Sequence, residues 1–476
     1  MPLTLPLEFS VILAVGASLF LLAAVSRTWI SVTLILVALV FSDLLISLVS
    51  PRLSSRDEIM ILQGFSFFAL CIVATPLILS VVRAKQNSYF ELLILGTIAL
   101  LTTYWAVGCV INGLRDATMY YRLFLMPLLL ILLGQYAGAT IGRTRLLSIV
   151  IGVATVTSAL VVVEFLAPRQ FYSVTGAETF FSLKDGFFSL DNLIDSRNRR
   201  LFNLKIIDDV QVFKPAGPTL NYPSTAYVLL AGFTVALALS AWLGALWCLV
   251  GLAIVTAKAA VVGVLVVTTI WLMGKRLRWF MPPSLVIASG IVYSMGAIWI
   301  LYNDLSIHAY SLLSTLFQVP LSPLGHGLGF GGSLTAERVL SWRFDMLIGD
   351  SGLAITLNML GLPGLLLYYF YGFLLARALA IARGLADLPL LCFAGLLAVA
   401  IFNSVVQELA IGPYGVGLAG FLCAFRIAGL AAGAPASVSF WQFAYRPRVA
   451  ARRAYAAQPA AELQGGRDLD RPAWSR

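Results

Sequence analysis

The chain has 476 residues, of which 60% are hydrophobic and 11% are charged, and its formal net charge is +10. Its mean hydropathy of +0.92 is too high for a soluble protein, whose surface would need many more charged residues. Apolar runs long enough to cross a bilayer recur from end to end. The composition therefore excludes a soluble globular protein and predicts an all-α, polytopic helical membrane protein.

The hydropathy pattern predicts about 13 transmembrane helices, in a range of about 12 to 14. The first apolar run follows MPLTLPLEFS, which has no positively charged segment, so we interpret it as a retained span rather than a signal peptide. The segment 222–273 would hold either two spans or three short ones. We expect spans near 7–26, 29–49, 59–82, 90–112, 123–141, 146–167, 222–240, 241–256, 258–273, 282–302, 350–376, 388–407 and 412–433.

The basic residues predict an orientation. With the amino terminus outside, every short loop that carries basic residues faces the cytoplasm, as the positive-inside rule requires. Three helices in 222–273 are favoured, because two would move Lys275, Arg276 and Arg278 to the side opposite the basic tail. We therefore expect a transmembrane domain over 1–445, with two long outer segments, 168–221 and 303–349. Residues 446–476 would form a basic, disordered cytoplasmic tail.

Cysteine and histidine usage gives no sign of a metal site. Two histidines are too few for a histidine-rich site. The cysteines all lie in apolar segments, without the spacing of a disulfide framework or a metal site, and we interpret them as packing residues: Cys71, Cys109, Cys248, Cys392 and Cys423.

Four charged residues fall near the predicted outer ends of spans: Asp43, Glu164, Lys258 and Glu408. Charges inside a membrane are costly and usually mark a cavity or a pathway. Each of them alone is equally well explained by a side chain that reaches to the interface. Four on one side favour a polar cavity that opens outward.

The most informative segment is the glycine-rich loop GHGLGFGG, which contains His326. Glycines let a backbone approach a ligand closely and offer N–H groups to an anion. Glu337, Arg338 and Arg343 follow, and Asp350 and Ser351 precede an apolar helix. A plain surface loop and an ordinary helix cap are the alternatives. That helix contains Gly361-Leu362-Pro363-Gly364 and should break near Met359.

Two lysines lie at predicted outer helix starts. Lys214 precedes the proline-rich stretch PAGPTLNYP, which leads into a span, and Lys258 lies at the outer hairpin between two short helices. Either lysine would suit a phosphate contact. The alternatives are an ordinary juxtamembrane turn for Lys214 and an interface-seeking side chain for Lys258.

This order of elements resembles the O-antigen polymerase and ligase superfamily, and the Wzy-type polysaccharide polymerases in particular. The resemblance covers about residues 210–372: a basic residue before a proline-rich span start, a basic residue at the next outer hairpin, the G-x-G-x-G loop, and a polar helix start followed by G-L-x-G. Ligases carry His-Asn where this chain has Asp350-Ser351. This departure favours a polymerase, with xanthan-type exopolysaccharide polymerases as the nearest likeness.

The resemblance implies a function and a location. It implies that the protein joins undecaprenyl-pyrophosphate-linked oligosaccharide repeat units at the outer face of the bacterial inner membrane. Membrane lipids and proteins that regulate chain length or export would be further partners. No cofactor, metal or nucleic acid is expected. A ligase, and a flippase or other transporter of lipid-linked oligosaccharides, are the alternatives.

The chemistry of such a transfer assigns roles to the candidate residues. A departing pyrophosphate needs cations, and the acceptor hydroxyl needs a base. The resemblance places the pyrophosphate at Lys214 and Lys258, and Arg338 and Arg343 would assist them. The candidate bases are Asp350, His326 and Glu337.

Overall fold

The computed structural model describes residues 28–83, 88–185, 189–200, 211–276, 290–291, 293–299, 307–332 and 351–432. The predicted span 7–26, most of 282–302 and the tail 446–476 lie outside these residues. So do Glu337, Arg338, Arg343 and Asp350.

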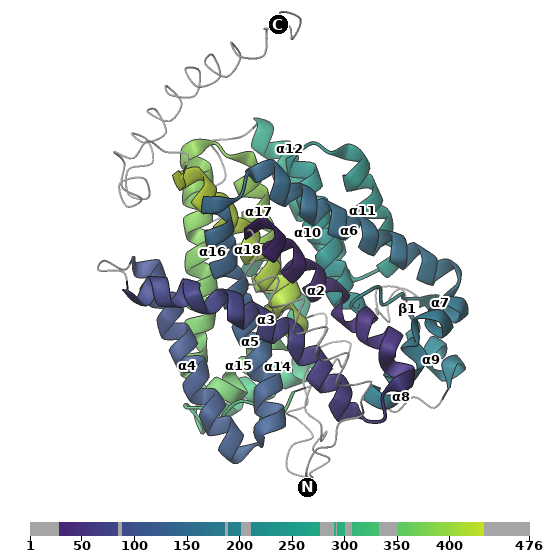
Figure 1. The fold of residues 1–476 in the computed structure, drawn as a ribbon. Coiled ribbons are helices and arrows are strands. Elements are labelled where there is room, and N and C mark those ends of the chain that lie inside the picture. The colour runs from purple at the N-terminus through teal and green to yellow at the C-terminus, as the bar shows by residue number, and fades with distance from the viewer. Residues whose placement is uncertain are drawn as a thin grey trace, which may run out of the picture.

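The first five helices form two hairpins and the start of a third (Figure 1). Their starts follow simple rules: α4 begins at a capping box of Ser88 and Glu91, and α5 begins after Gly113, whose φ is +90°. Each helix overlaps a predicted span. The bounds are α2 Thr28–Val49, α3 Arg56–Arg83, α4 Tyr89–Ile111, α5 Leu114–Thr140 and α6 Arg143–Leu166, with a short 3₁₀ turn, η1 Ser50–Arg52, after α2.

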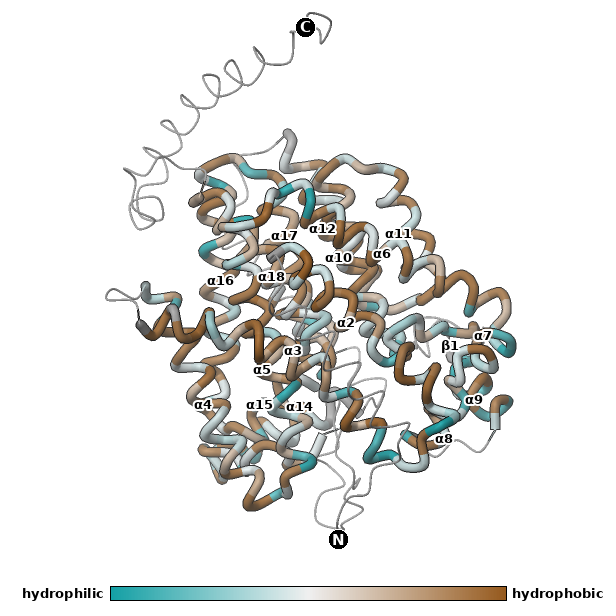
Figure 2. The backbone as a smooth tube through the Cα atoms, viewed as in Figure 1, coloured by the Kyte–Doolittle hydropathy of each residue, from teal (hydrophilic) through white to brown (hydrophobic). Residues whose placement is uncertain are grey.

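The predicted outer segment 168–221 contains secondary structure that hydropathy did not predict. Three short helices, α7 Pro168–Thr175, α8 Ala177–Asp185 and α9 Leu190–Arg197, precede an antiparallel pair of strands, β1 Asn198–Arg200 and β2 Gln211–Phe213. They enclose a separate core that includes Tyr172, Phe180 and Phe181 and packs on α2 and α3. Hydrophilic residues gather on this part of the chain (Figure 2).

The segment 222–273 forms three helices, as predicted: α10 Tyr222–Ala238, α11 Trp242–Val255 and α12 Lys258–Arg276. Asn221 caps α10, and Pro223 occupies its first turn, where a missing N–H costs nothing. The turn between α11 and α12 is sharp because Thr256 adopts a left-handed conformation, with φ +50°.

The remaining described elements confirm the predicted helix break. After α14 Ile307–Gln318, α15 Gly352–Leu360 ends at Gly361, and a 3₁₀ turn, η3 Leu362–Gly364, leads into α16 Leu365–Leu385. The chain returns through α17 Leu388–Ser404. A 3₁₀ turn, η4 Glu408–Ile411, and a π-helical turn, η5 Pro413–Gly417, then precede α18 Leu418–Ala432. The predicted span 412–433 therefore corresponds to η5 and α18.

Helix α5 is the centre of the bundle. It packs most extensively on α18, where Gly134 and Gly138 let the two backbones approach at Phe421 and Phe425. Among the described residues, seven helices are long and apolar enough to cross a membrane, and α10, α11, α12 and α17 are shorter apolar helices. The fold is thus an all-α polytopic membrane protein; the total of about 13 spans stays a prediction.

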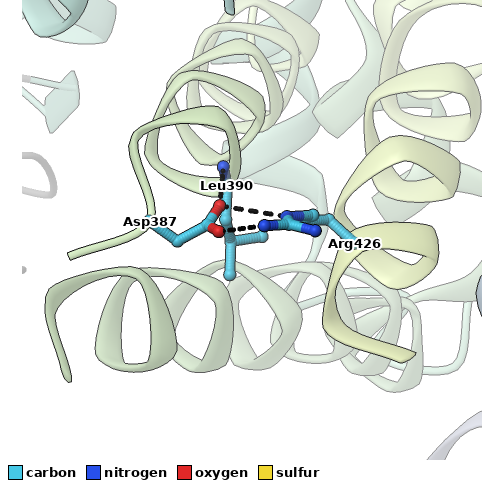
Figure 3. A network of polar contacts seen from close by, with 3 residues as sticks. All are labelled: Asp387, Leu390 and Arg426. Carbon is cyan, nitrogen blue, oxygen red and sulfur yellow. Dashed lines mark hydrogen bonds and ion pairs between the residues drawn. The ribbon is translucent and has the colours of Figure 1, made fainter. Parts of the chain in front are cut away.

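A partly buried ion pair fixes the end of the bundle that the charge pattern assigns to the cytoplasm. Asp387 caps α17 by accepting from the Leu390 N–H at 2.8 Å, and both its oxygens accept from the Arg426 guanidinium of α18 (Figure 3). At the start of α6, Arg145 lies 5.1 Å from the centre of the Trp29 ring. We call the opposite end, which carries α7–α9, the outer end.

Candidate functional site

The glycine-rich loop is held at the outer end by backbone contacts. The N–H groups of His326 and Gly327 donate to the carbonyls of Asn358 and Met359 in α15, both at 2.9 Å. The N–H of Leu328 donates to the Tyr104 carbonyl of α4 at 3.3 Å. These three N–H groups are therefore occupied within the protein and are not offered to an anion.

The glycines of this loop serve close packing instead. Gly327 has φ +83°, and a Cβ on it would lie 3.1 Å from the Gly108 backbone. The Asn112 side-chain amide donates to the carbonyls of His326, Gly327 and Leu328 at 3.1, 3.3 and 3.0 Å. The loop thus joins the α4–α5 hairpin to α15, and we call this set of contacts the glycine clasp.

The imidazole of His326 remains available for chemistry. It packs on the Phe330 ring at 4.3 Å between centroids, and no hydrogen bond to it occurs within the described part of the chain. Partial burial lowers the pKa of His326 below its usual value, so the ring is neutral near pH 7. A neutral imidazole can accept a proton.

Lys214 is buried, with only 1% of its surface exposed. It follows β2, its N–H donates to the Arg197 carbonyl at 3.1 Å, and its Nζ lies 5.7 Å from the centre of the Tyr222 ring at the start of α10. The sequence correctly placed this lysine beside a helix start. Its burial is the new fact, because a buried ammonium must meet a partner or a ligand.

Glu164 at the end of α6 fixes the segment that carries Lys214. Its carboxylate is fully buried and accepts from the N–H groups of Ala216 and Gly217 at 2.8 and 2.7 Å, and from the Tyr172 hydroxyl at 2.6 Å. Burial raises the pKa of Tyr172, which keeps this donor protonated. Glu164 is therefore a loop anchor, not the wall of an open cavity. Its backbone partners, about 50 residues away in the chain, leave no sequence signal.

Three helix starts meet at one irregular segment, residues 403–411, which we call the 403–411 turn. Tyr227 of α10, Ala259 of α12 and Ala410 of η4 form one small core. The Ser351 hydroxyl, which caps α15, donates to the Val405 carbonyl at 2.6 Å. The starts of α10, α12 and α15 therefore surround this turn.

Polar side chains around Asn403 hold the 403–411 turn in place. The Asn403 amide donates to Gln407 at 2.9 Å and to the Tyr227 hydroxyl, and the Tyr293 hydroxyl donates to the Asn403 side chain at 3.4 Å. Glu408 lies in the turn with 1% of its surface exposed. Such a satisfied network fixes the conformation of the turn within the apolar bundle.

Three helix starts and two lysines bring positive charge to this region, which also holds the carboxyl group of Glu408. Helix N-termini carry partial positive charge, and three of them start here. Lys258 is the first residue of α12, and Lys214 lies against the first residue of α10. Among the described residues, no group of His, Cys, Asp and Glu side chains could hold a metal ion.

The structure thus brings the two lysines to neighbouring helix starts, but it separates His326 from them. The His326 backbone meets α15 at Asn358, about 10 Å along the helix axis from Ser351. Asp350 immediately precedes Ser351 in the chain but lies outside the described residues. No family model, no curated protein and no solved structure matches this chain.

Proposed function

We propose that the chain polymerises undecaprenyl-pyrophosphate-linked oligosaccharide repeat units into exopolysaccharide at the outer face of the bacterial inner membrane. One observation carries the proposal: the starts of α10, α12 and α15 meet at the 403–411 turn, so that Lys258 and the Lys214 segment lie at one end of an apolar bundle. The motif resemblance described above supplies the substrate class.

The reaction follows from the chemistry of the donor. The hydroxyl oxygen of the acceptor sugar attacks the anomeric carbon of the donor glycan, and the carbon–oxygen bond to pyrophosphate breaks. Undecaprenyl pyrophosphate leaves with the bonding electrons, and a base takes the hydroxyl proton. Lys214, Lys258 and the helix N-termini would stabilise the charge on the leaving group, with Arg338 and Arg343 as further candidates.

Of the three candidate bases, Asp350 fits this scheme best. It is bonded to Ser351, whose hydroxyl fixes the start of α15 at the 403–411 turn, whereas His326 meets the far end of α15. His326 would then have a structural role in the glycine clasp, and Glu337 is the third candidate base. Asp350→Asn should abolish elongation, while His326→Gln should leave it largely intact.

Purified protein incubated with its lipid-linked repeat unit tests the function directly. A polymerase yields a ladder of lipid-linked products that differ by one repeat in mass. A ligase transfers the glycan to a new acceptor, and a transporter moves the lipid without lengthening it, so either result would reject the proposal. In cells, deletion should leave single repeats on the lipid carrier and abolish long polymer.

A further inference from the structure

Arg122 is a charged residue inside an apolar helix that the mechanism above does not use. It lies on α5, about 12 Å along the helix axis from the outer end of that helix at Leu114. It borders the predicted span 123–141, where a charge faces water, a partner or a ligand. Its side chain is only partly buried.

The protein gives this guanidinium little compensation. One Nη donates to the backbone carbonyl of Gln63 on α3 at 3.0 Å, and the Gln63 amide in turn donates to Asp43 of α2 at 2.9 Å. No carboxylate within the described residues pairs directly with Arg122. Arg426, by contrast, is paired with both oxygens of Asp387. A guanidinium has several N–H donors, so most of those on Arg122 are left for another acceptor.

Arg122 lies beside the candidate site. Helix α5 packs on η4 and η5, and Leu123, the residue after Arg122, lies against Gly412, just after the 403–411 turn. Tyr414 packs on the core of Tyr227 and Ala259, and its hydroxyl donates to the Leu39 carbonyl of α2 at 2.7 Å. Arg122 therefore lies on the α5 side of the turn, whereas Lys258 lies on the α12 side.

A second cation on another side of the same turn matches a requirement of polymerisation. Joining two lipid-linked glycans needs two pyrophosphates held at once, one that leaves and one that stays on the acceptor. We propose that Arg122 is the centre of a second pyrophosphate site, which holds the lipid-linked acceptor. The inference rests on the proposed function, and it assigns Lys214 and Lys258 to the donor. A planar guanidinium can bind a phosphate through two parallel hydrogen bonds.

The number of bound lipids tests this inference without any need for catalysis. Native mass spectrometry of the purified protein with undecaprenyl pyrophosphate should show two bound molecules. Arg122→Gln should bind one, with the second binding event weakened about ten- to a hundredfold. Arg115→Gln is the matched control, since Arg115 lies on the same helix and pairs with Asp57, and it should still bind two.

Several outcomes would overturn the second site. One is that Arg122→Gln binds two molecules with unchanged affinity, and another is that the wild type binds a single molecule. A third is that binding depends on Arg122 with phosphatidylglycerol but not with undecaprenyl pyrophosphate.

Inorganic pyrophosphate, added as a competitor, should displace the lipid less from Arg122→Gln than from the wild type. If Arg122→Gln does not fold, Arg122→Lys decides: weakening by about tenfold supports the site, and unchanged binding rejects it.

Failure of this inference is distinguishable from failure of the proposed function. Elongation by a folded Arg122→Gln variant at the wild-type rate, with two lipids bound, rejects only the second site. Two lipids bound by a wild-type protein that never elongates them, with one of the two lost in Arg122→Gln, would support the second site and reject the polymerase.

Discussion

Lys258 is the first residue of α12, where either a substrate anion or the membrane interface would account for its charge. If it contacts pyrophosphate, Lys258→Ala should lower polymer yield about ten- to a hundredfold, the effect of one lost charged hydrogen bond. Lys258→Arg should recover part of the yield because the charge is kept. Lys184→Ala, on the outer helix α8, is the matched control and should have no effect. Yields are compared at equal membrane expression, and wild-type yield from Lys258→Ala would remove the residue from the site.

Glu164 tests how the Lys214 segment is held. In Glu164→Gln, the amide nitrogen cannot accept from a backbone N–H, so Gly217 or Ala216 loses its acceptor. We expect a loss of about 1–3 kcal/mol in the stability of this region, seen as a lower melting temperature and faster proteolysis near residues 211–221. Glu178→Gln, an exposed residue of α8, is the control. Equal proteolysis of both variants would contradict the anchor.

His326 makes stability depend on pH. Because burial lowers its pKa in the folded protein, the unfolded chain binds a proton more readily than the folded chain. The neutral ring contributes its full stabilisation at a pH above the ordinary histidine pKa of about 6.5. This contribution is lost as the pH falls through the lower pKa of the folded protein. The melting temperature should therefore drop between pH 7.5 and 5.5 by more in the wild type than in His326→Gln. An identical drop in both would show that the ring has no such role.

At the scale of elements, the glycine clasp depends on contact between the α4 and loop backbones. A Cβ on Gly108 would overlap the backbone of Leu328, which cannot move aside as a flexible side chain would. Gly108→Ala should therefore destabilise the protein by about 1–3 kcal/mol and expose the 319–332 loop to protease. Gly96→Ala is a matched control on the same helix, because a Cβ there meets nothing within 4 Å. A stable Gly108→Ala variant with a protected loop would show that the clasp tolerates the added atom.

Hydropathy and helix-breaking residues predicted most of the described helices. The expected span 90–112 corresponds to Tyr89–Ile111, and the break near Met359 falls at Leu360, because these limits follow from local sequence. Helices α7–α9 were missed because they are short and mixed in composition. The 403–411 turn was also missed, since it unites Tyr227, Ala259 and Ser351, which are far apart in the chain. Lys258 was correctly placed at a helix start and Lys214 beside one, but the partners of Glu164 and Arg122 are set only by the fold.

At the scale of the whole molecule, the two ends of the bundle differ in how they are built. One end is tied by the Asp387–Arg426 pair and the Arg145–Trp29 contact. The other carries α7–α9, the clasp and the 403–411 turn, whose irregular backbone is tolerated at membrane depth only inside protein or beside a polar cavity. In the proposed function, a lipid-linked substrate would be processed at the second end, so the membrane side of this end decides whether the proposal holds.

The charge pattern predicts that this second end faces outward, and single cysteines can test it. Glu178 of α8 and Arg383 of α16 are exposed and lie at opposite ends of the bundle. In intact cells, an impermeant thiol reagent should label Glu178→Cys, whereas Arg383→Cys should react only after permeabilisation. The parent protein is the control for its five native cysteines, three of which are buried. The inverse pattern would place the 403–411 turn in the cytoplasm, where exported repeat units are absent, and would rule out polymerisation at the outer face.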